Sequence, residues 1–258
     1  MYIITSCLVC KSDNVVFEPT FLSRFILSRI ESKIRHIDLP ILSIKCNHCR
    51  FFSSTLRFTD EEMEKIYKDY RGYEYNKMRV AIEGDFYRPL IGTFTTPEAI
   101  EHRLKGINEI IDRSVNIGNI RKVLDYGGGA GHFIPGKFIF AEKFVYDISG
   151  TILCPEIKRY DPGRQVEWNY IQCCHVLEHV SDPIKFLKDM LKLANTNTLI
   201  YIEVPNGDGP SMHGVWHEHI NTFYEDSLEY IFQLVDLTIV DRQTRNGCIG
   251  FLAKKAIE

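Results

Sequence analysis

A glycine-rich loop in the middle of the chain restricts the fold more than any other feature of this sequence. Gly127, Gly129 and Gly131 follow a short apolar run at Lys122–Leu124. Glycines allow the backbone to turn sharply and to approach a ligand closely. We therefore predict a strand over this run, followed by a loop that lies against a bound ligand.

Two acidic residues indicate the charge of that ligand. Asp125 lies at the mouth of the loop, and Asp147 ends the next apolar run, Lys143–Tyr146. A dinucleotide-binding loop has the pattern G-x-G-x-x-G, but His132 takes the place of its last glycine. A carboxylate at Asp125 would repel a pyrophosphate and would suit the ammonium and sulfonium charges of S-adenosylmethionine (SAM). Asp147 could accept hydrogen bonds from the ribose hydroxyls of a nucleoside.

Short apolar runs alternate with helical stretches from Arg121 onward. This pattern predicts an α/β fold, with a mostly parallel sheet and helices on both faces. Helical periodicity falls near Pro183–Leu193 and Asp226–Leu234. Asn246 and Gly247 separate the last two runs and predict an antiparallel hairpin there. The predicted strands are Lys122–Leu124, Lys143–Tyr146, Asn169–Cys173, Thr198–Glu203, Leu237–Arg242 and Cys248–Ala253.

Three segments resemble motifs of class I SAM-dependent methyltransferases. They are Val123 to Gly131 for the first motif, His175-Val-Leu-Glu178-His179 after the fourth strand, and Glu203-Val-Pro205 for the fifth strand. The resemblance implies a Rossmann-like class I sheet. It also implies that SAM is bound by Asp125, Gly127, Gly129, Gly131, Asp147 and His175. Pro135 and Gly136 interrupt the stretch after the loop, so we expect the first helix there to be short or irregular.

Two C-x-x-C pairs, Cys7 with Cys10 and Cys46 with Cys49, mark the N-terminal region. Each pair places two thiolates on one turn, at the spacing that tetrahedral zinc needs, and two pairs complete a four-thiolate site. Such a closed site leaves no position for a reacting water, so we predict a structural zinc. His48 lies inside the second pair, and we assign it to the turn rather than to the ligand set.

The chain divides into three predicted parts: a zinc-binding module at 1–58, a helical connector or lid at 59–116, and a SAM-binding methyltransferase domain at 117–258. Within the module, apolar residues on one face predict a helix over Phe21–Ile37. Thr59, followed by acidic residues, predicts the start of a helix that runs to about Tyr70. A clearer helix is predicted from Pro97 to about Asn116.

The order of these three parts resembles the sugar C-methyltransferases of deoxysugar biosynthesis. Those enzymes methylate a carbon next to the keto group of a nucleotide-linked sugar, which requires a base and donors that hold the enolate. They carry an aromatic-x-Glu-His segment after the fifth strand, and the matching segment here is Trp216-His217-Glu218-His219. The resemblance implies that His219 is the general base. The other implied catalytic residues are Glu218, His217 and a connector tyrosine, Tyr73 or Tyr75.

Trp216 stands where that family often has tyrosine, so methylation at carbon and at oxygen both stay open. The alternatives are an O-methyltransferase acting on a surface-polysaccharide precursor, a zinc-containing RNA methyltransferase and a non-catalytic SAM-binding protein. A net charge of -3 argues against nucleic acid as the partner. No apolar run approaches the roughly 20 residues that span a bilayer, and the start does not resemble a signal peptide. We therefore expect a cytoplasmic protein that acts on a small, sugar-linked acceptor. The sequence does not determine its oligomeric state.

Overall fold

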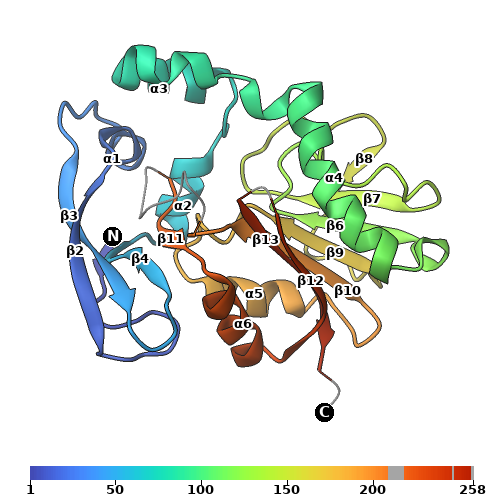
Figure 1. Cartoon of the computed structure of the whole chain (residues 1–258). Coiled ribbons are helices and arrows are strands. Elements are labelled where there is room, and N and C mark those ends of the chain that lie inside the picture. The colour runs from blue at the N-terminus through green and yellow to red at the C-terminus, as the bar shows by residue number, and fades with distance from the viewer. Residues whose placement is uncertain (209–217, 246, 257–258) are drawn as a thin grey trace.

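A 7-stranded sheet forms the centre of the larger part of the chain (Figure 1). The computed structural model describes residues 1–208, 218–245 and 247–256. The sheet has the strand order β12-β13-β10-β9-β6-β7-β8. The strands β6 to β10 are parallel, and β13 is antiparallel to both of its neighbours. Their bounds are β6 (Lys122–Tyr126), β7 (Glu142–Tyr146), β8 (Ile157–Arg159), β9 (Tyr170–Cys174), β10 (Leu199–Pro205), β12 (Leu237–Arg245) and β13 (Cys248–Lys255).

Helices cover both faces of this sheet, as the sequence pattern predicts. Helix α4 (Pro97–Ser114) packs on one face through Ile107, Ile110 and Ile111, which are fully buried. Helices α5 (Pro183–Leu191) and α6 (Glu225–Leu234) pack on the other face. The predicted Rossmann-like fold is therefore confirmed. None of the described helices combines the length and the apolar composition that crossing a membrane requires.

The stretch between β6 and β7 contains turns but no helix, where Pro135 and Gly136 had predicted a short or irregular one. Gly127 has φ +85°, a conformation that favours glycine. A Cβ atom at Gly127 would also lie 2.5 Å from a methyl group of Val176. The loop conformation therefore depends on the absence of a side chain at this position.

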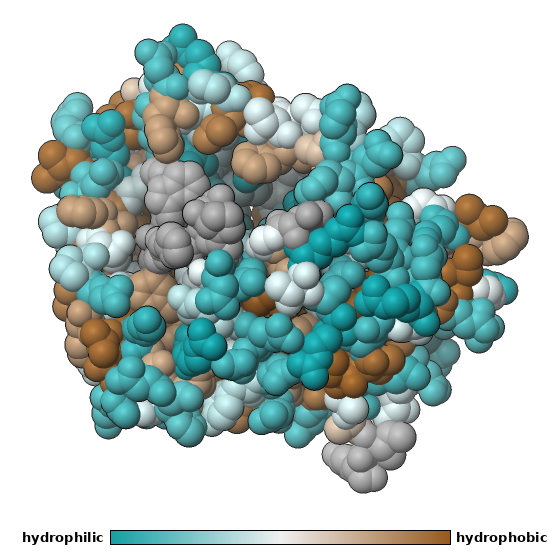
Figure 2. All heavy atoms as spheres, viewed as in Figure 1, coloured by the Kyte–Doolittle hydropathy of each residue, from teal (hydrophilic) through white to brown (hydrophobic). Residues whose placement is uncertain are grey.

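The N-terminal part is built on a second sheet with the order β11-β4-β3-β2. Its apolar residues are partly exposed, and Figure 2 shows small apolar groups over β2 and β3 on a largely hydrophilic surface. The short strands β1 and β5 pair with each other. The bounds are β1 (Tyr2–Ile3), β2 (Val15–Leu22), β3 (Leu39–Cys46), β4 (Phe52–Ser54), β5 (Leu56–Arg57) and β11 (Asn221–Thr222).

The helix predicted over Phe21–Ile37 is wrong at both ends. Phe21 belongs to β2, which pairs along its whole length with β3. Helix α1 begins only at Arg24, after Ser23 has capped its N-terminus, and it ends at Glu31. Ser32 adopts a left-handed conformation with φ 56°, which stops the helix. Backbone pairing with a distant strand therefore overrides the local helical periodicity.

The connector contains α2 (Asp60–Tyr67) and α3 (Tyr73–Glu83), followed by 3₁₀ turns at Gly84–Phe86, Arg88–Leu90 and Thr93–Thr95. A further 3₁₀ turn at Ile117–Asn119 leads into β6. The start predicted at Thr59 is confirmed, because its side chain and that of Glu62 form a reciprocal capping box. Helices α1, α2 and α3 bury their apolar faces against one another in a separate small core.

Two of the contacts that join the N-terminal part to the large sheet domain come from β11 and Arg57. Strand β11 follows β10 in the chain but pairs with β4 of the N-terminal sheet. Arg57, which is fully buried, donates to the backbone oxygens of Ser181 and Ile220 at 2.9 Å and 3.1 Å and to the Asn221 side chain at 2.7 Å. Burial lowers the pKa of Arg57 to about 10. These bonds stabilise its buried charge and hold the two parts together.

Candidate active site

The end of β6 presents a buried acidic group to the glycine-rich loop. Asp125 is 1% exposed, and neither of its carboxylate oxygens has a hydrogen-bond partner among the described residues. Burial raises the pKa of the Asp125 carboxyl to about 7. A Cβ atom at Gly128 would lie 2.2 Å from the Asp125 carboxyl carbon. The absence of a side chain at Gly128 therefore keeps the space beside the carboxylate open.

The acid at the end of β7 fixes the shape of the loop. The Asp147 carboxylate accepts hydrogen bonds from the backbone N–H of Gly129 at 2.7 Å and of Ser149 at 2.8 Å. The Gly127 N–H donates to the Tyr146 carbonyl at 2.7 Å. The two acids predicted from the sequence thus lie at the same edge of the sheet, on either side of the glycines.

These residues fit SAM as the ligand. A buried carboxylate without a partner costs stability unless a cationic or hydrogen-bonding group reaches it, and the amino group of SAM is such a cation. Asp125 would hold that amino group, and the loop from Gly127 to Gly131 would approach the rest of the ligand closely. When bound, SAM supplies an electrophilic methyl group.

His175 stands at the carboxyl end of β9 between two buried acids. Its Nε2 lies 3.1 Å from Oε1 of Glu203, and its Nδ1 lies 3.4 Å from Oε1 of Glu178. Burial and the charge of Arg103 lower the pKa of His175, but Cys248 and the two carboxylates raise it to about 10. His175 is therefore a cation at neutral pH, and it holds the segment after β9 against β10.

Two more histidines, His179 and His219, lie close to Glu178 and to each other. The rings of His179 and His219 have centroids 4.7 Å apart and lie nearly perpendicular to each other. Nε2 of His179 lies 3.7 Å from Oε1 of Glu178. Burial would raise the pKa of Glu178, but His175 and His179 lower it to about 2. Glu178 is therefore an anion that faces two histidines.

His219 is neutral at physiological pH. Burial and the nearby His179 together lower the pKa of its imidazole to about 4. Its Nδ1 is buried and has no hydrogen-bond partner among the described residues. An uncharged imidazole with a free ring nitrogen can accept a proton.

Glu218, the neighbour of His219, is bound by residues of the connector. Tyr70 donates to its Oε2 at 3.1 Å, and both Tyr75 and Arg79 donate to its Oε1. Burial would raise the pKa of Glu218, but Arg79 and His179 lower it. Glu218 was predicted to orient or assist the base. The structure engages its carboxylate with α3 and with the turn that precedes α3, and its role stays a prediction.

The connector tyrosine in this cluster is Tyr75. Tyr73 is 74% exposed, and the Lys77 ammonium lies 5.7 Å from its ring centroid. Residues two apart on a helix face different sides, which explains why only one of the two tyrosines reaches Glu218. His217, together with Trp216, lies outside the described residues.

Arg79 is a site residue that the sequence reasoning missed. It is buried, and it also pairs with Glu83 at 2.8 Å. Tyr75 and Arg79 are four positions apart in α3, so both lie on one helical face. An arginine on the buried face of a helix was the available signal, because arginine is rarely buried without a carboxylate partner.

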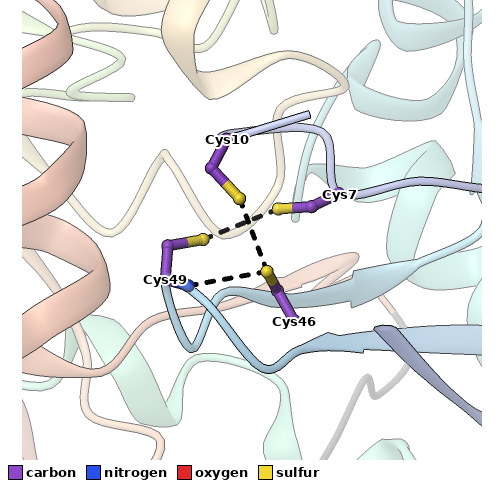
Figure 3. Close-up of side chains that lie close together, drawn as sticks. All are labelled: Cys7, Cys10, Cys46 and Cys49. Atoms are coloured by element: carbon purple, nitrogen blue, oxygen red, sulfur yellow. Dashed lines mark hydrogen bonds between the residues drawn. The ribbon is translucent and has the colours of Figure 1, made fainter. Parts of the chain in front are cut away.

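The four N-terminal cysteines converge, as predicted from their spacing. Figure 3 shows Cys7, Cys10, Cys46 and Cys49 with their sulfur atoms pointing toward one centre. Their ligand atoms all lie within 4.8 Å of one another. The Sγ atoms of Cys7 and Cys49 are 3.6 Å apart, and those of Cys10 and Cys46 are 3.5 Å apart. The backbone N–H of Cys49 donates to the sulfur of Cys46 at 3.5 Å.

Comparisons with known proteins agree with this architecture. A family model described as a methyltransferase domain matches residues 92–242, which is more than half of the chain. A 1,6-didemethyltoxoflavin-N1-methyltransferase from Burkholderia thailandensis, solved with S-adenosylhomocysteine, is 18% identical and has a TM-score of 0.51. That alignment covers 71% of this chain and 90% of the other, and at this identity it shows a shared fold.

Two further solved structures resemble the chain less closely. A SAM-dependent methyltransferase from Clostridium acetobutylicum is 12% identical, with a TM-score of 0.46 and coverage of 72% of this chain and 100% of that one. A magnesium protoporphyrin IX methyltransferase from Synechocystis is 15% identical, with a TM-score of 0.45 and coverage of 61% and 85%. No curated protein matches the chain. On the evidence of the family match and the fold, this chain belongs to the methyltransferase domain family and is a class I SAM-dependent methyltransferase.

Proposed function

We propose that this enzyme methylates a small acceptor linked to a sugar or nucleotide sugar, with His219 as the general base. The observation that supports this most directly is the neutral imidazole of His219, whose buried Nδ1 has no partner in the described part of the chain. General bases act in the deprotonated form, and this imidazole has that form throughout the neutral pH range. The sugar acceptor rests on the order of module, connector and methyltransferase domain along the chain.

The residues around the base have separate tasks in this proposal. Glu178 and His179 form the polar wall opposite His219, and the Glu178 carboxylate stabilises the positive charge that the imidazole gains when it takes a proton. Asp125 and the glycine-rich loop hold SAM. Asp147 keeps that loop in shape and faces the ribose. Glu218 orients the segment that carries His219 rather than exchanging a proton itself.

The four cysteines hold a structural zinc ion in this proposal. Four thiolates at about 2.3 Å from a zinc ion lie roughly 3.8 Å from one another in a tetrahedron, close to the two sulfur distances in the cluster. The N–H group of Cys49 that donates to the Cys46 sulfur suits a thiolate. All four positions around the ion are taken by protein, so zinc would stabilise the module and take no part in the reaction.

An acceptor screen with a deuterium-exchange readout tests this function. The enzyme would be incubated with nucleotide-linked keto sugars and SAM, and methylated products would be identified by mass spectrometry. In a parallel reaction in D₂O, S-adenosylhomocysteine would replace SAM, and NMR would follow exchange of the proton next to the keto group. Carbon methylation predicts exchange that is lost in His219→Gln. Methylated product without exchange would instead assign the reaction to oxygen.

A matched control variant and the results that would contradict the proposal complete the test. His36 is an exposed histidine far from the cluster in the chain, so His36→Gln should keep both product formation and exchange. Equal rates for His219→Gln and the wild type would contradict the role of His219. Absence of product with every sugar-linked acceptor, from a protein that binds S-adenosylhomocysteine, would overturn the acceptor class.

A further inference from the structure

Arg103 of helix α4 points a buried cationic group toward the glycine-rich loop. The guanidinium carbon lies 3.9 Å from the ring centroid of Phe133, which follows that loop. Its Nε and Nη2 atoms are buried and have no hydrogen-bond partner among the residues that the structure describes. Buried N–H donors of a charged group are costly to leave unpaired. The geometry therefore indicates a missing anionic partner.

The protein's own acids do not fill this role. Arg103 forms no ion pair with any carboxylate in the described ranges. It nevertheless lies near two buried carboxylates, those of Asp125 and Glu203. Its positive charge acts to lower the pKa of each, although burial still raises the net pKa of Asp125. Two unpaired groups of opposite charge, Asp125 and Arg103, thus flank the same loop.

The position of Arg103 is rigid. Ile107, one turn further along α4, is fully buried against the sheet. Gln243 of β12 donates to the backbone oxygen of Gly106 at 2.8 Å and so ties the same turn to the sheet. Contact with Phe133 restrains the plane of the guanidinium. A fixed guanidinium can bind a carboxylate through two parallel hydrogen bonds.

We propose that Arg103 binds the carboxylate of the methionine moiety of SAM. The amino-acid end of SAM carries an ammonium and a carboxylate on one carbon, and the loop presents one unpaired anion and one unpaired cation. Asp125 takes the ammonium, and Arg103 takes the carboxylate. The inference rests on SAM as the cofactor and adds a residue from outside the sheet, on the helix that precedes the loop.

Calorimetric titration with two ligands tests this assignment. S-adenosylhomocysteine has the amino-acid end, whereas 5′-methylthioadenosine keeps the nucleoside and lacks the carboxylate. Arg103→Met retains the apolar length of the side chain and removes its charge. Its Kd for S-adenosylhomocysteine should rise about ten- to a hundredfold, as expected for a charge-assisted pair, and its Kd for methylthioadenosine should change less than about twofold. Arg103→Lys should lie between, because lysine cannot form the bidentate pair.

Arg113 on the same helix provides the control. It forms an exposed ion pair with Asp241 at 3.2 Å, so Arg113→Met should leave both affinities unchanged. Unchanged binding of S-adenosylhomocysteine by Arg103→Met would overturn the proposal, and so would an equal loss for both ligands. If the Met variant does not fold, as judged by circular dichroism, the Lys variant carries the same comparison. Failure of the wild type to bind S-adenosylhomocysteine would overturn the cofactor itself and the proposed function with it.

Discussion

Binding of S-adenosylhomocysteine should weaken below neutral pH, because Asp125 must be ionised to hold the ammonium group of the ligand. The side chain is 1% exposed, and burial raises its pKa to about 7. With that pKa, about half of the free protein carries an ionised Asp125 at pH 7 and about a tenth at pH 6. The apparent Kd varies inversely with this fraction, so it should rise about fivefold from pH 7 to pH 6.

Calorimetry measures both the affinity and the proton that accompanies binding. Titrations at pH 7 in buffers with different ionisation enthalpies should show release of about half a proton, because the bound ammonium keeps Asp125 ionised. Asp125→Asn should bind more weakly at pH 8 and lose the pH dependence. An affinity that is flat between pH 6 and pH 8 in the wild type would refute the assignment, as would the same slope in the Asn variant.

The stability of the ligand-free protein gives an independent check with a defined sign. The folded pKa of Asp125 lies above the reference value of 3.8, so the native state binds this proton more tightly than the unfolded state. The carboxyl therefore contributes most to stability below about pH 4, and this contribution is lost as pH rises toward 7. Asp125→Asn removes that loss. The difference in the free energy of unfolding between Asp125→Asn and the wild type, measured in urea titrations, should therefore grow in favour of the variant from pH 5 to pH 8.

Three further substitutions, the last with a matched control, test other parts of the site. Cys46→Ser should lose the bound zinc, measured by elemental analysis, and should lower Tm; an unchanged metal content would contradict the four-thiolate site. His219→Gln should reduce kcat by about a hundredfold or more while the Kd for S-adenosylhomocysteine stays the same, which separates the base from the cofactor site. Tyr75→Phe should lower the free energy of unfolding by about 1.5–3 kcal/mol, because it removes a buried donor to the charged Glu218. Tyr73→Phe should leave it unchanged, since that side chain is exposed.

The sheet domain could be predicted because its signals are local. Each central strand is a short apolar run, and glycines and acids mark the ends of β6 and β7. The carboxyl ends of parallel strands meet at one edge of a sheet, so Asp125 and Asp147 had to be neighbours once the strands were assigned. The cysteine pairs were equally informative, because each C-x-x-C turn fixes the separation of its own two thiols.

The N-terminal part was harder to predict because its structure depends on distant pairing. The Phe21–Ile37 periodicity is real only from Arg24 to Glu31, and the residues before it join a strand whose partner begins at Leu39. Nothing local to β4 indicates that it pairs with β11. The same limit applies to the cluster at Glu218. Its partners come from the connector, and no pattern in the sequence relates the connector to the segment that carries Glu218.

The contacts of the segment that carries His219, the proposed base, argue that the N-terminal half forms part of the proposed active site. Glu218, directly before His219, is bound by Tyr70, Tyr75 and Arg79, all from the connector. Directly after it, the backbone oxygen of Ile220 accepts from Arg57, and β11 pairs with β4. The residues before and after His219 are therefore held by elements from outside the sheet domain. The residues proposed to hold the cofactor, in contrast, belong to the sheet, to its glycine-rich loop and to α4. It follows that, under the proposed function, the four-cysteine module and the connector determine the position of His219, whereas the sheet determines the position of the methyl donor.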